Sequence, residues 1–90
     1  MNYTVIWLSA LENELTRLYL LARADGHAEA VTRATAVIDQ LLTADPVRAG
    51  ESRTGRVRIL VELPMTVDFE VLEAERTVVV TAVRYHRPTR

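Results

Sequence analysis

Residues 57–85 read VRILVELPMTVDFEVLEAERTVVVTAVRY, and this stretch decides the fold. Apolar and polar side chains alternate along it with a period of two residues, which is typical of β-strands. Residues 64–65 (PM) and 73–76 (EAER) divide it into three runs. Because connections this short join antiparallel neighbours, we expect a three-stranded meander. One alternate apolar set should face the helices that precede the meander, namely Val57, Ile59, Val61, Leu63, Val67, Phe69 and Val71.

Residues 3–8 (YTVIWL) are mostly β-branched or aromatic and predict a further strand with apolar side chains on both faces. Two helices are expected between this strand and the meander. The strand should therefore run antiparallel to its neighbour if it lies beside the first or last meander strand, and parallel only beside the middle one. The sequence leaves the strand order open.

Two amphipathic helices are predicted before the meander. Ser9 and Glu12 have the spacing of a capping box and predict the start of the first helix, which ends near residues 25–26 (DG). The second helix ends at residues 45–46 (DP), because the residue before a proline disfavours helical geometry. Their apolar stripes are Leu11, Leu15, Leu18 and Ala22 in the first helix, and Ala28, Val31, Thr35, Ile38 and Leu42 in the second.

The predicted fold class is therefore α+β. An N-terminal strand and a two-helix hairpin should pack on a mainly antiparallel four-stranded sheet, in the order β-α-α-β-β-β. The chain has 90 residues, of which 49% are apolar, so residues 1–90 should form a single domain with one core. Residues 47–55 are polar and aperiodic, which predicts a surface loop.

The composition argues against several kinds of site and segment. The chain has no Cys, and His27 and His86 lie far apart in the sequence, so we expect neither a disulfide nor a metal site. No cofactor motif such as a Gly-rich phosphate loop occurs, and no cofactor is expected. Residues 1–8 lack the features of a signal peptide, and no apolar run approaches the roughly 18 residues of a spanning helix. We expect a cytoplasmic protein that does not enter membranes.

All eleven basic residues are Arg, which favours bidentate contacts with carboxylates or phosphates. The formal net charge is −1, but residues 1–47 are net acidic and residues 48–90 are net basic. A pI near 6.1 argues against tight, non-specific binding of nucleic acid.

Two clusters of polar residues are candidates for a site. They lie beside the loop before the meander and at the end of its last strand, and they consist of Glu51, Arg53, Arg56 and Arg58, and of Arg84, Tyr85, His86 and Arg87. These positions fall at opposite ends of the sheet, so the loop must fold along the sheet to join them. The alternative interpretation is that no site forms and the arginines pair with acidic residues of neighbouring strands. The candidate partners are Glu62, Asp68, Glu70, Glu73 and Glu75.

His86 suits acid–base chemistry, because the unperturbed pKa of a histidine is about 6.5. Arg, Glu, Tyr and His side chains can support phosphodiester transfer without a metal ion. A base removes a ribose 2′-OH proton, guanidinium groups stabilise the charge that develops at phosphorus, and an acid protonates the leaving 5′-oxygen. RNA would then supply its own nucleophile.

The order of elements and several short motifs resemble the RelE/ParE superfamily of bacterial toxin–antitoxin modules. The resemblance spans nearly the whole chain, and the closing Arg84, Tyr85 and His86 are similar to the end of YoeB-type members. Its further pieces are Tyr3, Val5 and Trp7, residues 38–42 before residues 45–46, residues 50–53 (GESR), residues 58–60 (RIL), Val67, Phe69, Val71 and Val83.

The resemblance implies a toxin that cleaves messenger RNA on the ribosome and is neutralised by a cognate antitoxin. It implies His86 as the acid and Glu51 as the base. With these two, we assign catalytic roles to Arg58 and Tyr85. Binding of the RNA phosphates is assigned to Arg53, Arg56, Arg84 and Arg87.

Three departures keep other functions open. The superfamily's nucleases carry an Arg early in the strand that here contains residues 66–69 (TVDF), where no basic residue stands. Asp68 would repel a phosphate if it faced the site, and Arg87 stands where an aromatic residue is common. The alternatives are a ParE-like inhibitor of DNA gyrase and a catalytically silent interaction module. A homodimer that pairs the edges of residues 57–62 is also possible.

Overall fold

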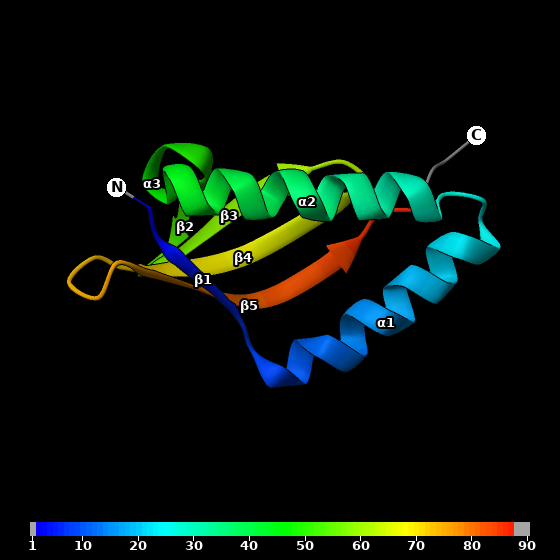
Figure 1. Ribbon diagram of the computed structural model, residues 1–90, viewed down its shortest axis with the longest axis horizontal. Coiled ribbons are helices and arrows are strands. Elements are labelled where there is room, and N and C mark those ends of the chain that lie inside the picture. Colours follow the sequence, from blue (N-terminus) through cyan, green and yellow to red (C-terminus); the bar gives the residue numbers. More distant parts are fainter. Residues whose placement is uncertain (1, 88–90) are drawn as a thin grey trace.

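The computed structural model describes residues 2–87, which form an α+β fold (Figure 1). The predicted order of strand, helical hairpin and meander is confirmed. The structure adds a short helix and a strand between the hairpin and the meander, so the sheet has five strands instead of the expected four. The elements are β1 (Thr4–Trp7), α1 (Ser9–Ala24), α2 (Ala28–Ala44), α3 (Pro46–Ala49), β2 (Glu51–Thr54), β3 (Val57–Glu62), β4 (Met65–Leu72) and β5 (Thr77–Tyr85).

The additional elements α3 and β2 occupy the segment that was expected to be a loop. Pro46 opens α3, because its fixed φ suits the first helical position, and the Asp45 side chain accepts a hydrogen bond from the backbone N–H of Arg48 at 3.4 Å. β2 then pairs antiparallel with β3 and covers the edge that was expected to be free. All four residues of β2 are exposed, so no apolar alternation marks this strand in the sequence.

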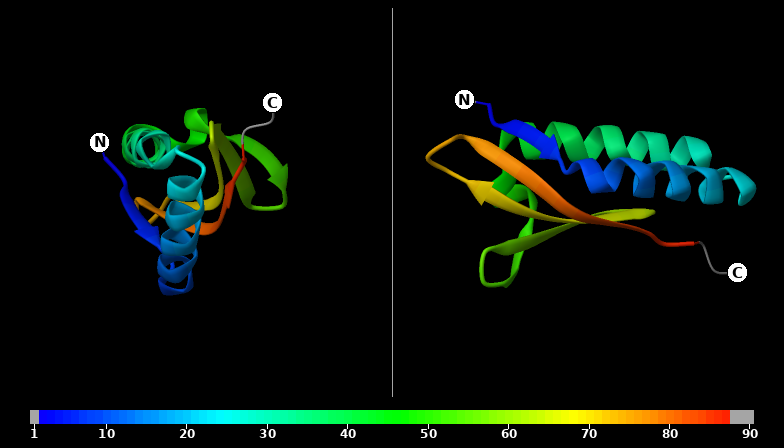
Figure 2. Two further views of the ribbon diagram at one scale, coloured as in Figure 1. Left: turned by 90° about the vertical axis from the view of Figure 1, so that its right-hand side faces the viewer. Right: turned by 90° about the horizontal axis from the view of Figure 1, so that it is seen from below.

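The strands lie in the order β1-β5-β4-β3-β2, and β1 runs parallel to β5. The expectation that β1 would be antiparallel to the last meander strand is wrong. Only Leu8 separates β1 from α1, so α1 continues in the direction of β1 instead of folding back (Figure 2). α2 makes the return, and the meander therefore starts in the same direction as β1.

The helix ends follow the sequence only in part. α1 begins at Ser9 as predicted, but Leu8 occupies the capping position and no side chain caps it, so the capping box at Ser9 is wrong. The end of α1 is as predicted: Gly26 has φ of +81°, and His27 N–H returns to the carbonyl of Ala22 at 2.7 Å. None of the helices within residues 2–87 has the length and apolar content needed to cross a membrane.

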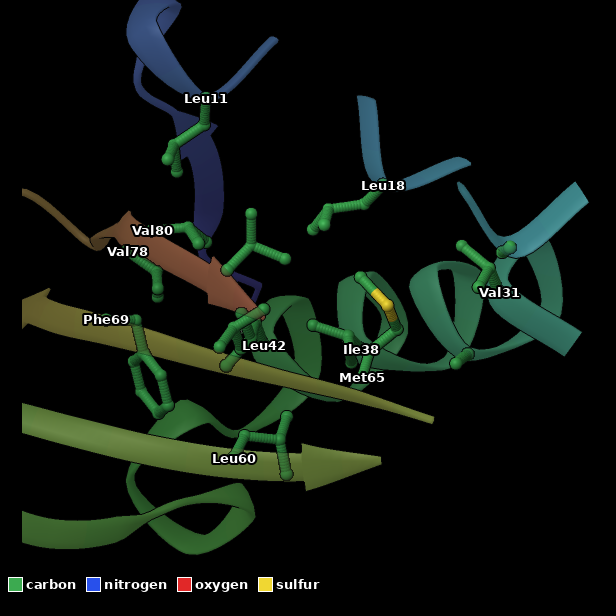
Figure 3. Packing of buried hydrophobic residues seen from close by; sticks show 14 residues of the cluster. Leu11, Leu18, Val31, Ile38, Leu42, Leu60, Met65, Phe69, Val78 and Val80 are labelled. Carbon is green, nitrogen blue, oxygen red and sulfur yellow. The ribbon is translucent and has the colours of Figure 1, made fainter. Parts of the chain in front are cut away.

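Both long helices lie on the same face of the sheet, and the core fills the space between them and the strands (Figures 2 and 3). Phe69, Val67, Val78 and Val80 are fully buried on this helix-covered face, opposite Ile38 of α2. The remaining core side chains come from every long element: Leu11, Leu18, Ala22, Val31, Ala34, Leu42, Leu60, Met65 and Val83. Within residues 2–87, no helix lies on the opposite face of the sheet, which we call the open face (Figure 2).

The predicted apolar set of β3 faces the open side of the sheet, so the prediction that it would face the helices is wrong. Leu60 pairs with Val67 and is buried beneath the helices, whereas Ile59 pairs with Asp68 and looks the other way. Both alternate sets of this strand contain an apolar residue, so the period alone cannot decide which set is buried. The prediction is confirmed for β4, where Val67 and Phe69 face the core.

Replacing Gly50 with Ala should destabilise the fold, although Gly50 has an ordinary φ of −116°. A Cβ atom there would lie 2.5 Å from Phe69 Cζ and 2.9 Å from the carbonyl oxygen of Ile59. Because the core is closely packed, we expect Gly50→Ala to lower the free energy of unfolding by about 1–3 kcal/mol, measured by urea denaturation.

The matched background is Phe69→Leu, which removes the outer ring atoms that a new Cβ would meet. We expect Gly50→Ala to cost clearly less in this background than in the wild type. Equal costs in the two backgrounds would show that the ring does not create the constraint.

Candidate functional site

A groove of about 460 Å³ crosses the open face of the sheet. The strand register explains its lining, because directly paired residues place their side chains on the same face. Thr66 pairs with Arg84 and with Val61, and Asp68 pairs with Ile59. The lining residues are Arg53, Ile59, Val61, Leu63, Thr66, Asp68, Arg84 and His86.

A β-bulge in β5 turns the end of this strand toward the groove. Phe69 pairs with Val80 and Asp68 pairs with Ala82, so Thr81 is an extra residue in the ladder. Val80 and Val83 are both buried, three positions apart instead of two. This shift places Arg84 and His86 on the open face, where an uninterrupted alternation from Val80 would have directed them into the core.

The groove brings together three of the eight predicted site residues, Arg53, Arg84 and His86. The two sequence clusters meet because β2 folds back along β3. Glu51 pairs with Ile59 and so shares the open face, but it is exposed and does not line the groove. Arg56 is exposed in the turn between β2 and β3 and also lies outside the lining.

His86 is held through its ring by β4 and through its backbone by the turn that precedes β4. Its Nε2 atom lies 2.6 Å from Thr66 Oγ1, and its backbone N–H donates to the carbonyl of Pro64 at 2.7 Å. Thr66 is polar but buried, with 3% of its surface exposed. Thr66 is not among the site residues predicted from the sequence, although its alternation with Val67 places it on the face opposite the core.

Arg84 is engaged by Asp68 across the strands. Its Nη2 donates to Asp68 Oδ1 at 2.7 Å and its Nη1 donates to Oδ2 at 3.4 Å. This hydrogen bonding raises the pKa of Arg84. The expected alternative, in which an arginine pairs with an acid of a neighbouring strand, is confirmed for this pair. Asp68 therefore lines the groove and offsets one of its positive charges.

Arg58 lies on the helix-covered face, away from His86. It pairs with Phe69, and its Nη2 donates to the carbonyls of Val47 at 2.6 Å and Gly50 at 2.8 Å. These bonds tie β3 to α3 and to the start of β2. The catalytic role predicted for Arg58 would require it to reach a groove on the other side of the sheet.

Tyr85 and Arg87 both donate to Asp25, at the corner between α1 and α2. Tyr85 Oη donates to Asp25 Oδ2 at 2.9 Å, and Arg87 donates to Oδ1 at 2.6 Å and to Oδ2 at 3.0 Å. Burial and then the bond to Asp25 raise the pKa of Tyr85. No sequence pattern signals this contact, because Asp25 lies 60 residues before Tyr85.

A second, mainly apolar groove of about 410 Å³ runs between α1 and α2. Leu15 and Tyr19 of α1 face Val31 and Thr35 of α2 across it. Trp7 of β1 is only partly buried and also lines this groove. We call it the helix groove.

No family model and no curated protein matches the sequence. The fold matches a chain in the crystal structure of the toxin–antitoxin complex RelBE2 from Mycobacterium tuberculosis. The TM-score is 0.70 at 16% sequence identity, and the match covers 96% of this chain and 100% of that chain. The chain therefore shares the fold of that chain, and this agrees with the fold that the resemblance in the sequence implied.

Asp25 should make stability depend on acid pH. Hydrogen bonds from Arg87 and then from Tyr85 hold the pKa of Asp25 below its usual 3.8. A depressed pKa stabilises the fold above the unfolded-state value, and this contribution is lost as the pH falls through the folded-state value. We expect Asp25→Asn to be less stable than the wild type at neutral pH, and the difference in urea midpoint to close below pH 3.8.

Asp39→Asn is the control for this titration, because it removes a carboxylate from an exposed position on α2. It should change the urea midpoint little. A stability difference for Asp25→Asn that stayed constant into strong acid would contradict the assignment.

Proposed function

We propose that this chain is the toxin component of a toxin–antitoxin module and that it cleaves messenger RNA on the ribosome without a metal ion. The observation that carries the proposal is the groove on the open face, in which Arg53, Arg84 and His86 converge. The likeness of the fold to a chain from a toxin–antitoxin complex supports it. A cytoplasmic location follows from these proposed partners.

In the proposed reaction, the ribose 2′-oxygen attacks the adjacent phosphorus and the bond to the 5′-oxygen breaks. His86 protonates the leaving 5′-oxygen, and Glu51, which shares the open face, is the candidate base for the 2′-OH proton. Arg53 and Arg84 stabilise the charge on the phosphate oxygens. Thr66 holds the imidazole in place at 2.6 Å. The products are a 2′,3′-cyclic phosphate and a free 5′-hydroxyl.

The helix groove is the surface that we assign to the cognate antitoxin. Its lining is mainly apolar, and Tyr19 on its rim is 41% exposed. An amphipathic segment of the antitoxin would bury these side chains, which is how helical peptides are commonly bound. This surface is separate from the open face, so antitoxin binding and RNA binding can be tested independently.

A second function has its own support. Four of the predicted site residues are engaged within the chain: Arg58 by backbone carbonyls, Arg84 by Asp68, and Tyr85 and Arg87 by Asp25. This favours a protein that binds without cleaving, either a ParE-like inhibitor of DNA gyrase or a silent interaction module. A gyrase supercoiling assay with purified protein separates the first of these from a nuclease, which should leave supercoiling unchanged.

His86→Ala should slow cleavage strongly. Purified protein is incubated with translating ribosomes, and new 5′-hydroxyl ends are mapped on the message. Loss of the proton donor should lower the cleavage rate by about 10²–10⁴-fold. The same variant should no longer arrest growth on expression, whereas the wild type should arrest growth unless the antitoxin is co-expressed.

The matched control is His27→Ala, which removes the other histidine, at the start of α2. It should cleave like the wild type. A message with a 2′-deoxyribose at the cleavage site should resist the wild-type protein. Cleavage at the wild-type rate in His86→Ala, or cleavage of the deoxy-substituted message, would contradict the mechanism.

Asp68→Asn should strengthen RNA binding. It removes a negative charge from the groove and releases the Arg84 guanidinium for a phosphate. We expect tighter binding of a short single-stranded RNA. We also expect the slope of log K against log salt to become steeper by about 0.7, as for one more phosphate contact.

Glu70→Gln is the control, because Glu70 lies on the same face of β4 but does not line the groove. It should leave the salt slope nearly unchanged. Equal effects of the two substitutions would indicate a general change of net charge instead of the release of Arg84.

A further inference from the structure

The segment that carries His86 continues beyond the sheet ladder. The last ladder pair joins Tyr85 to Met65, and His86 and Arg87 follow it. Successive side chains of an extended segment point to opposite sides. Tyr85 and Arg87 accordingly reach one side, where both end on Asp25, whereas His86 reaches the groove on the other side.

The carboxylate of Asp25 is fixed by the helical hairpin. The backbone N–H of Asp25 donates to the carbonyls of Leu21 and Ala22, both at 3.1 Å, at the end of α1. Its side chain is 14% exposed and accepts three hydrogen bonds from Tyr85 and Arg87. A rigid helix end therefore holds the two residues that flank His86.

Residues 84–87 form a wall between two hollows. The groove lies on one side, and a smaller hollow of about 320 Å³, lined by Leu18 and Leu21 of α1, lies on the other. The side chain of Arg87 is 60% exposed, so packing alone does not fix it. The two hydrogen bonds from Arg87 to Asp25 fix the position of the Arg87 side chain.

We infer that Asp25 is a positioning residue for His86: by holding Tyr85 and Arg87, it keeps the imidazole against Thr66 in the groove. The inference rests on the proposed function, in which His86 transfers a proton. Asp25 itself lies on the other side of the wall and touches no RNA. Its effect should therefore fall on the chemical step and not on binding.

The test compares the wild type with Asp25→Ala and Tyr85→Phe. We expect Asp25→Ala to lower kcat for cleavage by about ten- to a hundredfold, because small displacements of a catalytic group are costly, with KM nearly unchanged. Tyr85→Phe removes one of the three bonds and should lower kcat less. Glu29→Ala, which removes an exposed carboxylate from the first turn of α2, should cleave like the wild type.

Rescue distinguishes positioning from a general loss of stability. The exchange Asp25→Arg with Arg87→Asp recreates the ion pair with its charges reversed, and it should recover most of the kcat that Asp25→Arg alone loses. A second measurement is independent of RNA. The nuclear Overhauser effect between the His86 ring and the Thr66 methyl group should weaken in Asp25→Ala and return in the exchange variant.

Unchanged kcat and an unchanged Overhauser effect in Asp25→Ala would overturn the inference, and so would a weakened effect with unchanged kcat. If Asp25→Ala does not fold, Tyr85→Phe and Arg87→Gln decide by the same two measurements. If the wild type cleaves no RNA, the proposed function fails. The Overhauser effect then still decides whether Asp25 holds His86 in place.

Discussion

Both the core and the candidate site depend on one constraint: the helices cover a single face of a sheet in which side chains alternate. Val67 and Phe69 must face α2 to be buried, so Thr66 and Asp68 must face away from it. The open face therefore receives polar groups from the same strand that supplies the centre of the core. A shift of one residue in the register of β4 would turn Val67 and Phe69 away from the helices and Thr66 and Asp68 toward them, so both the core and the groove would be lost.

Charge in the groove is nearly balanced within the chain. Asp68 engages Arg84, which leaves Arg53 and His86 as the groove residues on which an anionic ligand would depend first. A nuclease built this way would bind RNA weakly through its own charges and would rely on a large assembly such as the ribosome to present the message. The same balance suits a protein that binds a partner without cleaving anything. The two proposed functions therefore differ in one requirement. RNA cleavage needs the Arg84–Asp68 ion pair to break so that Arg84 can bind a phosphate, whereas binding without cleavage does not.

The sequence predicted most of the fold and part of the site. Alternation in residues 65–71 and the stop signals at Gly26 and Pro46 gave the order of elements and the helix ends. β2 was missed because its residues are all exposed, and the buried side of β3 was misassigned because Leu60 lies in its polar set. Asp25 could not be connected with Tyr85 from the sequence, because that contact exists only after the hairpin packs on β5.

The extra residue at Thr81 divides β5 into two parts, in which opposite sets of alternate residues face the core. Before Thr81, the even-numbered residues Val78 and Val80 face the core. After Thr81, the odd-numbered Val83 faces the core, so Arg84 lies on the open face. Substitutions in residues 84–87 can therefore alter what the surface recognises without changing the phase of the interior strand. A chain of this design can diversify its chemistry at one end of a strand while its scaffold stays constant.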